Sequence, residues 1–148
     1  MTRLILAREH EHLLEDETFA ERFAVLEKAF ESATFSFTPG TVNVVFIEAA
    51  FFDFDRKLHV TLACVNETGK TINGLHGLLR MHFNNRSEKI SSTQLDFDEA
   101  FLGFVENNTA VLVTLEIPVE GLEGDHDFSP SEYGGSFENV RVSYSQDN

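Results

Sequence analysis

The chain has 148 residues, 42% of them hydrophobic, which is enough for one domain with a substantial core and argues against disorder of the whole chain. It carries 25 acidic against 11 basic residues, a formal net charge of −14. Such a charge is repelled by nucleic-acid phosphates and by anionic membrane surfaces, so neither is an expected partner, whereas a basic protein or calcium stays open.

The first twelve residues are expected to form an arm or a short strand through Leu4 to Leu6. Their apolar run is too short for a secretory signal, and acidic residues follow it at once. No window of the sequence reaches the length of a transmembrane segment. The sequence therefore predicts a cytoplasmic protein with no membrane insertion.

A helix is predicted next, beginning at a capping box of Thr18 and Glu21 and ending near Phe30 to Ser32. One face of this helix carries four apolar residues, Phe19, Phe23, Leu26 and Phe30. This face docks either on the protein's own sheet or on a partner, and the sequence leaves both open. The turn Thr38-Pro39-Gly40 marks the end of this N-terminal region. We expect residues 1–40 to form an arm and helix packed on a domain of residues 41–148.

The rest of the chain has the period-two alternation of half-buried strands. Its most regular part, Leu58 to Phe83, predicts a hairpin whose two strands flank a polar turn at Asn66 to Lys70. Further strands are predicted at Val42 to Phe54, Ile90 to Phe97, Val111 to Ile117 and Phe137 to Tyr144. Pro118 is expected to end the pairing of its strand, and the acidic segment 120–135 is expected to be mobile.

Six or seven short strands with turn residues between them fit an antiparallel two-layer β-sandwich best. The predicted fold class is thus mainly β, a sandwich of immunoglobulin-like architecture with an N-terminal α-helix. The single cysteine, Cys64, excludes an internal disulfide and is expected to be a small core residue.

His76, Arg80 and His82 lie on the side of their predicted strand opposite Leu79 and Met81. This pattern indicates the solvated face of a sheet, and we take these three residues as a candidate interaction surface. His59 would join the two histidines if their strands were neighbours. No catalytic residue, cofactor or metal site is predicted.

Other polar groups have an ordinary interpretation as solvated side chains, among them the tract His10-Glu11-His12. Two acidic clusters, Asp53 to Asp55 and Asp96 to Glu99, and the acidic loop Glu120 to Asp127 could attract a cation. However, the ligand spacing of an EF-hand loop is missing from all of them.

Short motifs recur in a recognisable order between about Phe46 and Ile117. They are Val65-Asn66 at a strand end, Lys70-Thr71-Ile72, Leu95-Asp96-Phe97, Leu102-Gly103 and Leu112-Val113-Thr114-Leu115. This order resembles the SLAP domain of accessory Sec system S-layer assembly proteins in Gram-positive bacteria. That family has Arg where Val65 stands and Pro-Trp where Leu112-Val113 stand. The resemblance implies a β-sandwich without known catalytic residues and a link to the export of surface proteins.

Two functions are consistent with these patterns. The first is a non-enzymatic protein-interaction module that works by surface contact, through a sheet edge or the face bearing His76, Arg80 and His82. The alternative is a cation- or small-ligand-binding β-sandwich protein that uses its acidic loops.

Overall fold

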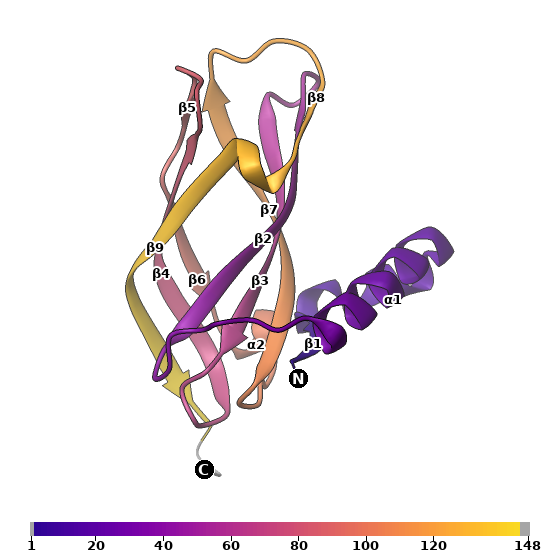
Figure 1. Ribbon diagram of the computed structural model, residues 1–148, viewed down its shortest axis with the longest axis vertical. Helices are drawn as coiled ribbons and strands as arrows, with labels where there is room; N and C mark the ends of the chain where they lie inside the picture. Colours follow the sequence, from indigo (N-terminus) through magenta and orange to yellow (C-terminus); the bar gives the residue numbers. More distant parts are fainter. Residues whose placement is uncertain (1, 146–148) are drawn as a thin grey trace.

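Two β-sheets face each other across a hydrophobic core in the computed structural model, which describes residues 2–145 (Figure 1). Sheet A has the strand order β1 (Arg3–Leu6), β7 (Thr109–Glu120), β3 (Lys57–Asn66), β2 (Val42–Phe52), β8 (His126–Phe128), and β5 (Lys89–Ile90) also pairs with β7. Sheet B has the order β6 (Thr93–Phe97), β4 (Ile72–Phe83), β9 (Tyr133–Tyr144). The helical segments are η1 (Arg8–Glu15), α1 (Glu17–Ser32), α2 (Glu99–Leu102) and η2 (Pro130–Glu132).

The prediction of a mainly β two-layer sandwich with an N-terminal helix is therefore confirmed. Strand pairing is antiparallel apart from β1, which runs parallel to β7. Because β1 belongs to sheet A, the predicted N-terminal arm contributes a strand to the sandwich. In the described part of the chain, no helix has the length and hydrophobicity of a membrane span.

The core between the sheets follows the predicted alternation. Leu62 of β3, Met81 of β4 and Val113 of β7 are all buried there. Neighbouring positions of opposite parity turn to the outer faces of the sheets. The sulfur of Cys64 lies in this core, and burial raises the pKa of its thiol to about 12.

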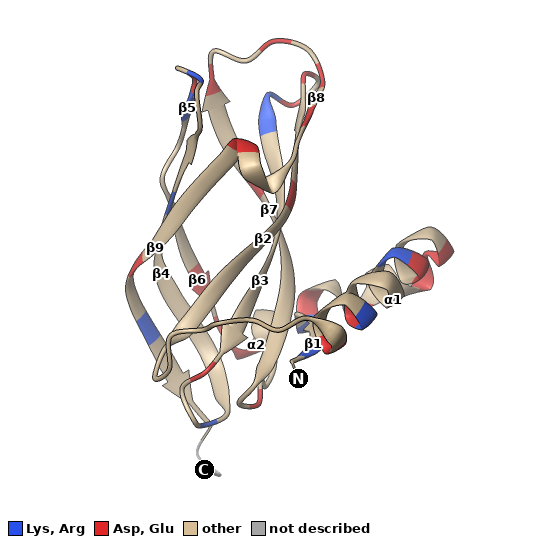
Figure 2. Ribbon diagram, in the orientation of Figure 1, with Lys and Arg blue, Asp and Glu red and all other residues tan. Residues whose placement is uncertain are grey.

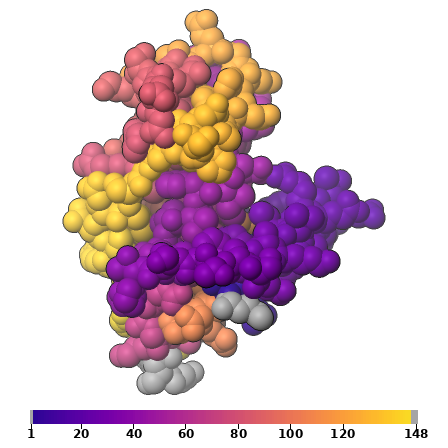
Figure 3. Space-filling model, in the orientation of Figure 1, coloured from indigo at the N-terminus to yellow at the C-terminus, as the bar shows by residue number. Residues whose placement is uncertain are grey.

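A second hydrophobic cluster lies on the outer face of sheet A. Ala63 and Val65 end β3, and Ala110 and Leu112 begin its antiparallel neighbour β7, so the four apolar side chains meet at one end of the sheet. Phe23 and Phe30 of α1 are buried against this apolar end. The segment that follows α1 then crosses the strands to the start of β2 (Figures 1 and 3).

The beginning of α1 differs from the predicted capping box. The cap is Asp16, whose carboxylate accepts a hydrogen bond from the Phe19 backbone N–H at 2.9 Å. Thr18 and Glu21 are exposed positions inside the helix. An Asp that precedes the helix is an equally good cap, because its oxygen reaches the same unpaired N–H groups of the first turn.

The predicted hairpin between the strands at Leu58 and Phe83 is wrong. β3 pairs with β2 and β7 in sheet A, whereas β4 pairs with β6 and β9 in sheet B, so the turn carries the chain from one sheet to the other. Buried Asn66 holds this crossover: its amide donates to the Lys70 and Val105 carbonyls at 2.7 and 2.9 Å and accepts from the Thr68 N–H at 3.0 Å.

Two further expectations are corrected near the end of β7. Pro118 is the last residue opposite β3, but β7 continues to Glu120 by pairing with β5. The acidic segment 120–135, predicted to be mobile, contains β8, which pairs with β2, and the buried side chains of Leu122 and Phe128. Apolar residues inside an acidic segment were enough to anchor it.

Candidate functional site

The three residues of the predicted interaction surface do lie together on one face of β4, the outer face of sheet B. Two of them already have acidic partners: His76 Nδ1 lies 3.0 Å from Asp96 Oδ1, and Arg80 Nε donates to Glu138 Oε1 at 3.2 Å. The hydrogen bond from His76 is the main reason that the pKa of Asp96 lies below its usual range. The positive charge of this face is therefore largely compensated within the protein.

The sequence left open that His59 lies close to His76 and His82, but the fold separates them. His59 is on β3 in sheet A, whereas His76 and His82 are on β4 in sheet B. The three side chains consequently lie on opposite outer faces of the sandwich. His10 packs edge-on against Phe101, with ring centroids 5.2 Å apart, and serves the packing of η1.

The two acidic clusters divide into separate structural roles. Asp53 pairs with Arg56 at 2.6 Å and accepts from the Gly124 N–H at 3.2 Å, which fastens the acidic loop to the turn between β2 and β3. Asp98 caps α2 by accepting from the Phe101 N–H at 3.0 Å. Asp53 and Asp98 therefore each make a structural contact within the protein.

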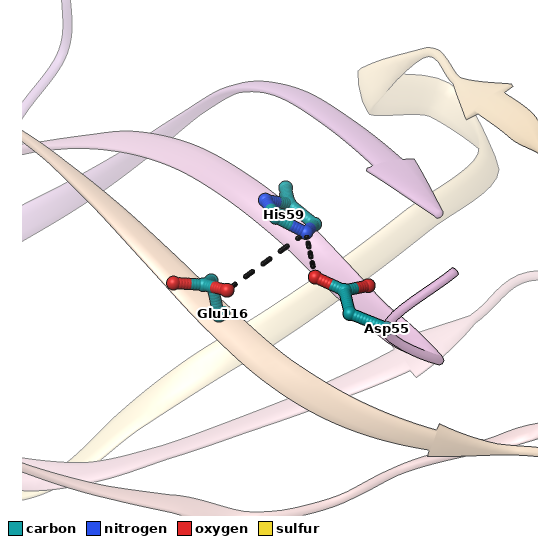
Figure 4. Close-up of side chains that lie close together, drawn as sticks. All are labelled: Asp55, His59 and Glu116. Carbon is teal, nitrogen blue, oxygen red and sulfur yellow. Dashed lines mark hydrogen bonds and ion pairs between the residues drawn. The ribbon is translucent and has the colours of Figure 1, made fainter. Parts of the chain in front are cut away.

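A group that the sequence analysis missed lies on the outer face of sheet A, near the beginning of β3 (Figure 4). His59 of β3 points toward Asp55, from the turn before β3, and toward Glu116, its direct neighbour on β7. Its Nε2 lies 2.7 Å from Asp55 Oδ2 and 4.0 Å from Glu116 Oε1. The short sequence separation of Asp55 and His59 could have predicted that these two side chains are close. The strand register that places Glu116 beside them could not be predicted from the sequence.

The ionisation of Asp55 reflects these contacts. Loss of surrounding water acts to raise the pKa of this carboxyl, but hydrogen bonds from the His59 ring and the Lys57 N–H outweigh it. The pKa of Asp55 is thereby held below its usual range, so the carboxylate is ionised at neutral pH.

A groove of about 440 Å³, here called the β1 groove, follows the free edge of sheet A. It is lined by all four residues of β1 (Arg3–Leu6). Leu14 of η1, Phe23 of α1 and the segment Leu102 to Phe104 also line it.

Charged and apolar side chains both line the β1 groove, the charged ones being Arg3, Arg8, Glu11 and Glu27. Phe104 and Leu14 are 48% and 42% exposed, two of the few large hydrophobic residues on the described surface. Arg8 lies beside them, with its guanidinium carbon 5.6 Å from the centroid of the Phe104 ring. Figure 2 shows that the other basic residues are spread over several elements of an otherwise acidic molecule.

The fold defines a two-layer β-sandwich protein with a free sheet edge at β1 and two outer sheet faces. A scan against protein-family models, a search of curated proteins and a search of solved structures each found no match.

Proposed function

We propose that the protein is a non-enzymatic protein-interaction module that binds an extended segment of a partner protein along the free edge of β1. The observation that carries this proposal is the course of the β1 groove, which is lined by every residue of the edge strand. An added strand needs such access along the backbone rather than at a single side chain.

The chemistry of the groove supports this mode of binding. An edge strand offers backbone N–H and C=O groups to a new strand, which supply affinity without depending on the partner's sequence. The exposed rings and methyl groups of Phe104 and Leu14 offer apolar contact for alternate side chains of the partner. Aromatic side chains at the centre of an interface are frequent sources of binding energy.

The class of partner is a further part of the proposal. The resemblance to the SLAP domain makes a component of surface-protein export in a Gram-positive bacterium the first partner to test. The alternative surface for any partner is the face of His76, Arg80 and His82, and the experiment below separates the two.

Selection of binders from a library of random linear peptides tests the proposal. We expect the selected peptides to shift the amide resonances of Arg3 to Leu6 and of Phe104 in heteronuclear NMR spectra. Phe104→Ala should weaken binding of these peptides by roughly tenfold or more, because a buried aromatic contact is lost.

Arg80→Ala is the matched control, since it removes a large side chain from the opposite candidate surface. It should leave the affinity of the selected peptides unchanged. Recovery of no binding peptide, or binding that Arg80→Ala weakens and Phe104→Ala does not, would contradict the proposal.

A further inference from the structure

We infer that Asp55, His59 and Glu116 form a binding site for a divalent transition metal ion, with Zn²⁺ as the cation that suits them best. The three side chains each present one ligand atom, and these atoms all lie within 4.8 Å of one another (Figure 4). This site is separate from the β1 groove, and the inference does not depend on the proposed function.

The distances between the ligand atoms are close to those of a tetrahedral zinc site. Ligands about 2.1 Å from a tetrahedral zinc ion lie about 3.4 Å from each other. His59 Nε2 is 2.7 Å from Asp55 Oδ2 and 4.0 Å from Glu116 Oε1, values on either side of that separation. All three separations are at most 4.8 Å, and binding would require the two carboxylates to rotate so that these separations become more equal.

The hydrogen-bonding capacity of the histidine also favours a cation. One imidazole nitrogen carries at most one proton, so Nε2 can donate to only one of the two carboxylates that approach it. Asp55 accepts that bond at 2.7 Å, and Glu116 stays at 4.0 Å. A dication between the three atoms would interact with both carboxylates and with the nitrogen lone pair at once.

The surroundings hold the ligands in place. His59 and Glu116 are opposite each other in the antiparallel register of β3 and β7, so the backbone fixes their spacing. Asp55 uses its second oxygen, Oδ1, to accept from the Lys57 N–H at 3.1 Å, an outer-shell contact of the kind that orients metal ligands. The Phe52 ring packs edge-on against His59 at a centroid distance of 4.8 Å and shields one side.

The ligand types select among metals. One imidazole and two carboxylates suit Zn²⁺ and related transition metals, whereas Ca²⁺ takes six to eight oxygen ligands. Three protein ligands leave a fourth position for water or another small ligand. Access to it is available, because the side chains of Asp55, His59 and Glu116 are 20%, 32% and 58% exposed and His59 lines a groove of about 460 Å³.

Isothermal titration calorimetry with ZnCl₂ on the full chain, first stripped with a chelator and then dialysed, tests this inference. We expect one Zn²⁺ to bind per chain at this site. His59→Ala and Glu116→Gln should each lower the affinity by roughly tenfold or more. Glu116→Gln keeps the size and hydrogen-bonding ability of an exposed side chain, so it tests the site even if His59→Ala reduces stability.

His76→Ala is the matched control, because His76 forms a His–Asp pair of similar length with Asp96 but has no third ligand among residues 2–145. It should leave Zn²⁺ binding unchanged, and the visible absorption of bound Co²⁺ should disappear in Glu116→Gln but persist in His76→Ala. Equal losses in the His59 and His76 variants, binding that Glu116→Gln does not affect, or no heat of binding at millimolar Zn²⁺ would overturn the inference.

Discussion

At the scale of single residues, the protonation of His10 is coupled to the packing of η1 and so to folding. Its ring contacts Phe101, and its Nε2 accepts a hydrogen bond from the Thr114 backbone N–H at 3.4 Å. Burial, as the largest cause, lowers the pKa of His10 from its ordinary value of 6.5. The unfolded chain therefore takes up this proton more readily than the folded chain, and protonation favours unfolding.

The contribution of His10 to stability is consequently complete above pH 6.5 and is lost as the pH falls through its lowered folded pKa. In His10→Gln the amide oxygen can still accept from Thr114, but no group titrates. We expect the unfolding free energy, measured with urea at a series of pH values between neutral and mildly acidic, to fall less steeply in His10→Gln than in the wild type. Parallel pH profiles for the two proteins would contradict this assignment.

Tyr133 is a residue whose polar group is not used by the fold. Its hydroxyl is the one buried side-chain polar atom without a hydrogen-bond partner among the described residues. Burial raises the pKa of this phenol to about 12, so it stays neutral. Burying an unpaired hydroxyl costs free energy that a hydrocarbon ring would not.

Tyr133→Phe should therefore leave the stability unchanged or raise it by up to about 2 kcal/mol. Denaturant unfolding of the purified variant measures this. Tyr144→Phe is the control, because Tyr144 is 44% exposed and loss of its hydroxyl should have no effect. A clear loss of stability in Tyr133→Phe would mean that the hydroxyl has a partner, such as a buried water molecule.

At the scale of secondary-structure elements, the position of α1 is set by the strands beneath it. Burial in β3 alternates from Lys57 to Thr61 and becomes continuous from Leu62 to Asn66, and β7 begins with an equally continuous buried run. Both buried runs lie at the same end of sheet A, because β3 and β7 are antiparallel. The helix covers that end and leaves the polar end, with His59 and Glu116, accessible.

Substitutions on α1 test this packing. Phe23→Asp should destabilise the protein by about 3 kcal/mol, because a side chain that is 8% exposed would be replaced by a carboxylate without a partner. Val25→Asp on the same helix is the control, since Val25 is 69% exposed and should change stability by less than about 0.5 kcal/mol. Equal melting temperatures for the two variants would argue that the helix does not depend on its own sheet.

The turn after β3 shows why the order of strands was harder to predict than the strands. Two alternating segments with a short polar turn between them are typical of a hairpin, and nothing local distinguishes a crossover. The crossover is fixed by Asn66, whose amide reaches Val105, a residue 39 positions away in the sequence. An Asn at the end of a strand signals a turn but not the distant carbonyl that it will bind.

At the scale of the whole molecule, the two inferred sites lie on different parts of sheet A. The β1 groove follows the free edge, and the site of Asp55, His59 and Glu116 lies on the outer face, on the turn and strands β3 and β7. Zinc binding and peptide binding can therefore be measured independently. The net charge of −14 adds to the attraction of a cation for the second site.

The sequence by itself determined most local features: the main strand segments, their buried parity, the apolar stripe of α1 and the buried position of Cys64. The single strand predicted from Ile90 to Phe97 was wrong, because β5 and β6 divide this segment between the two sheets. The periodicity of apolar residues predicts which positions of a helix or strand are buried, because the local backbone conformation sets the direction of each side chain. Only the tertiary structure decided which strands pair, that the chain crosses between sheets after Asn66, and that Glu116 lies opposite His59. Pairing and register depend on the burial of whole faces by residues far apart in the sequence, and that information is not present in any single segment.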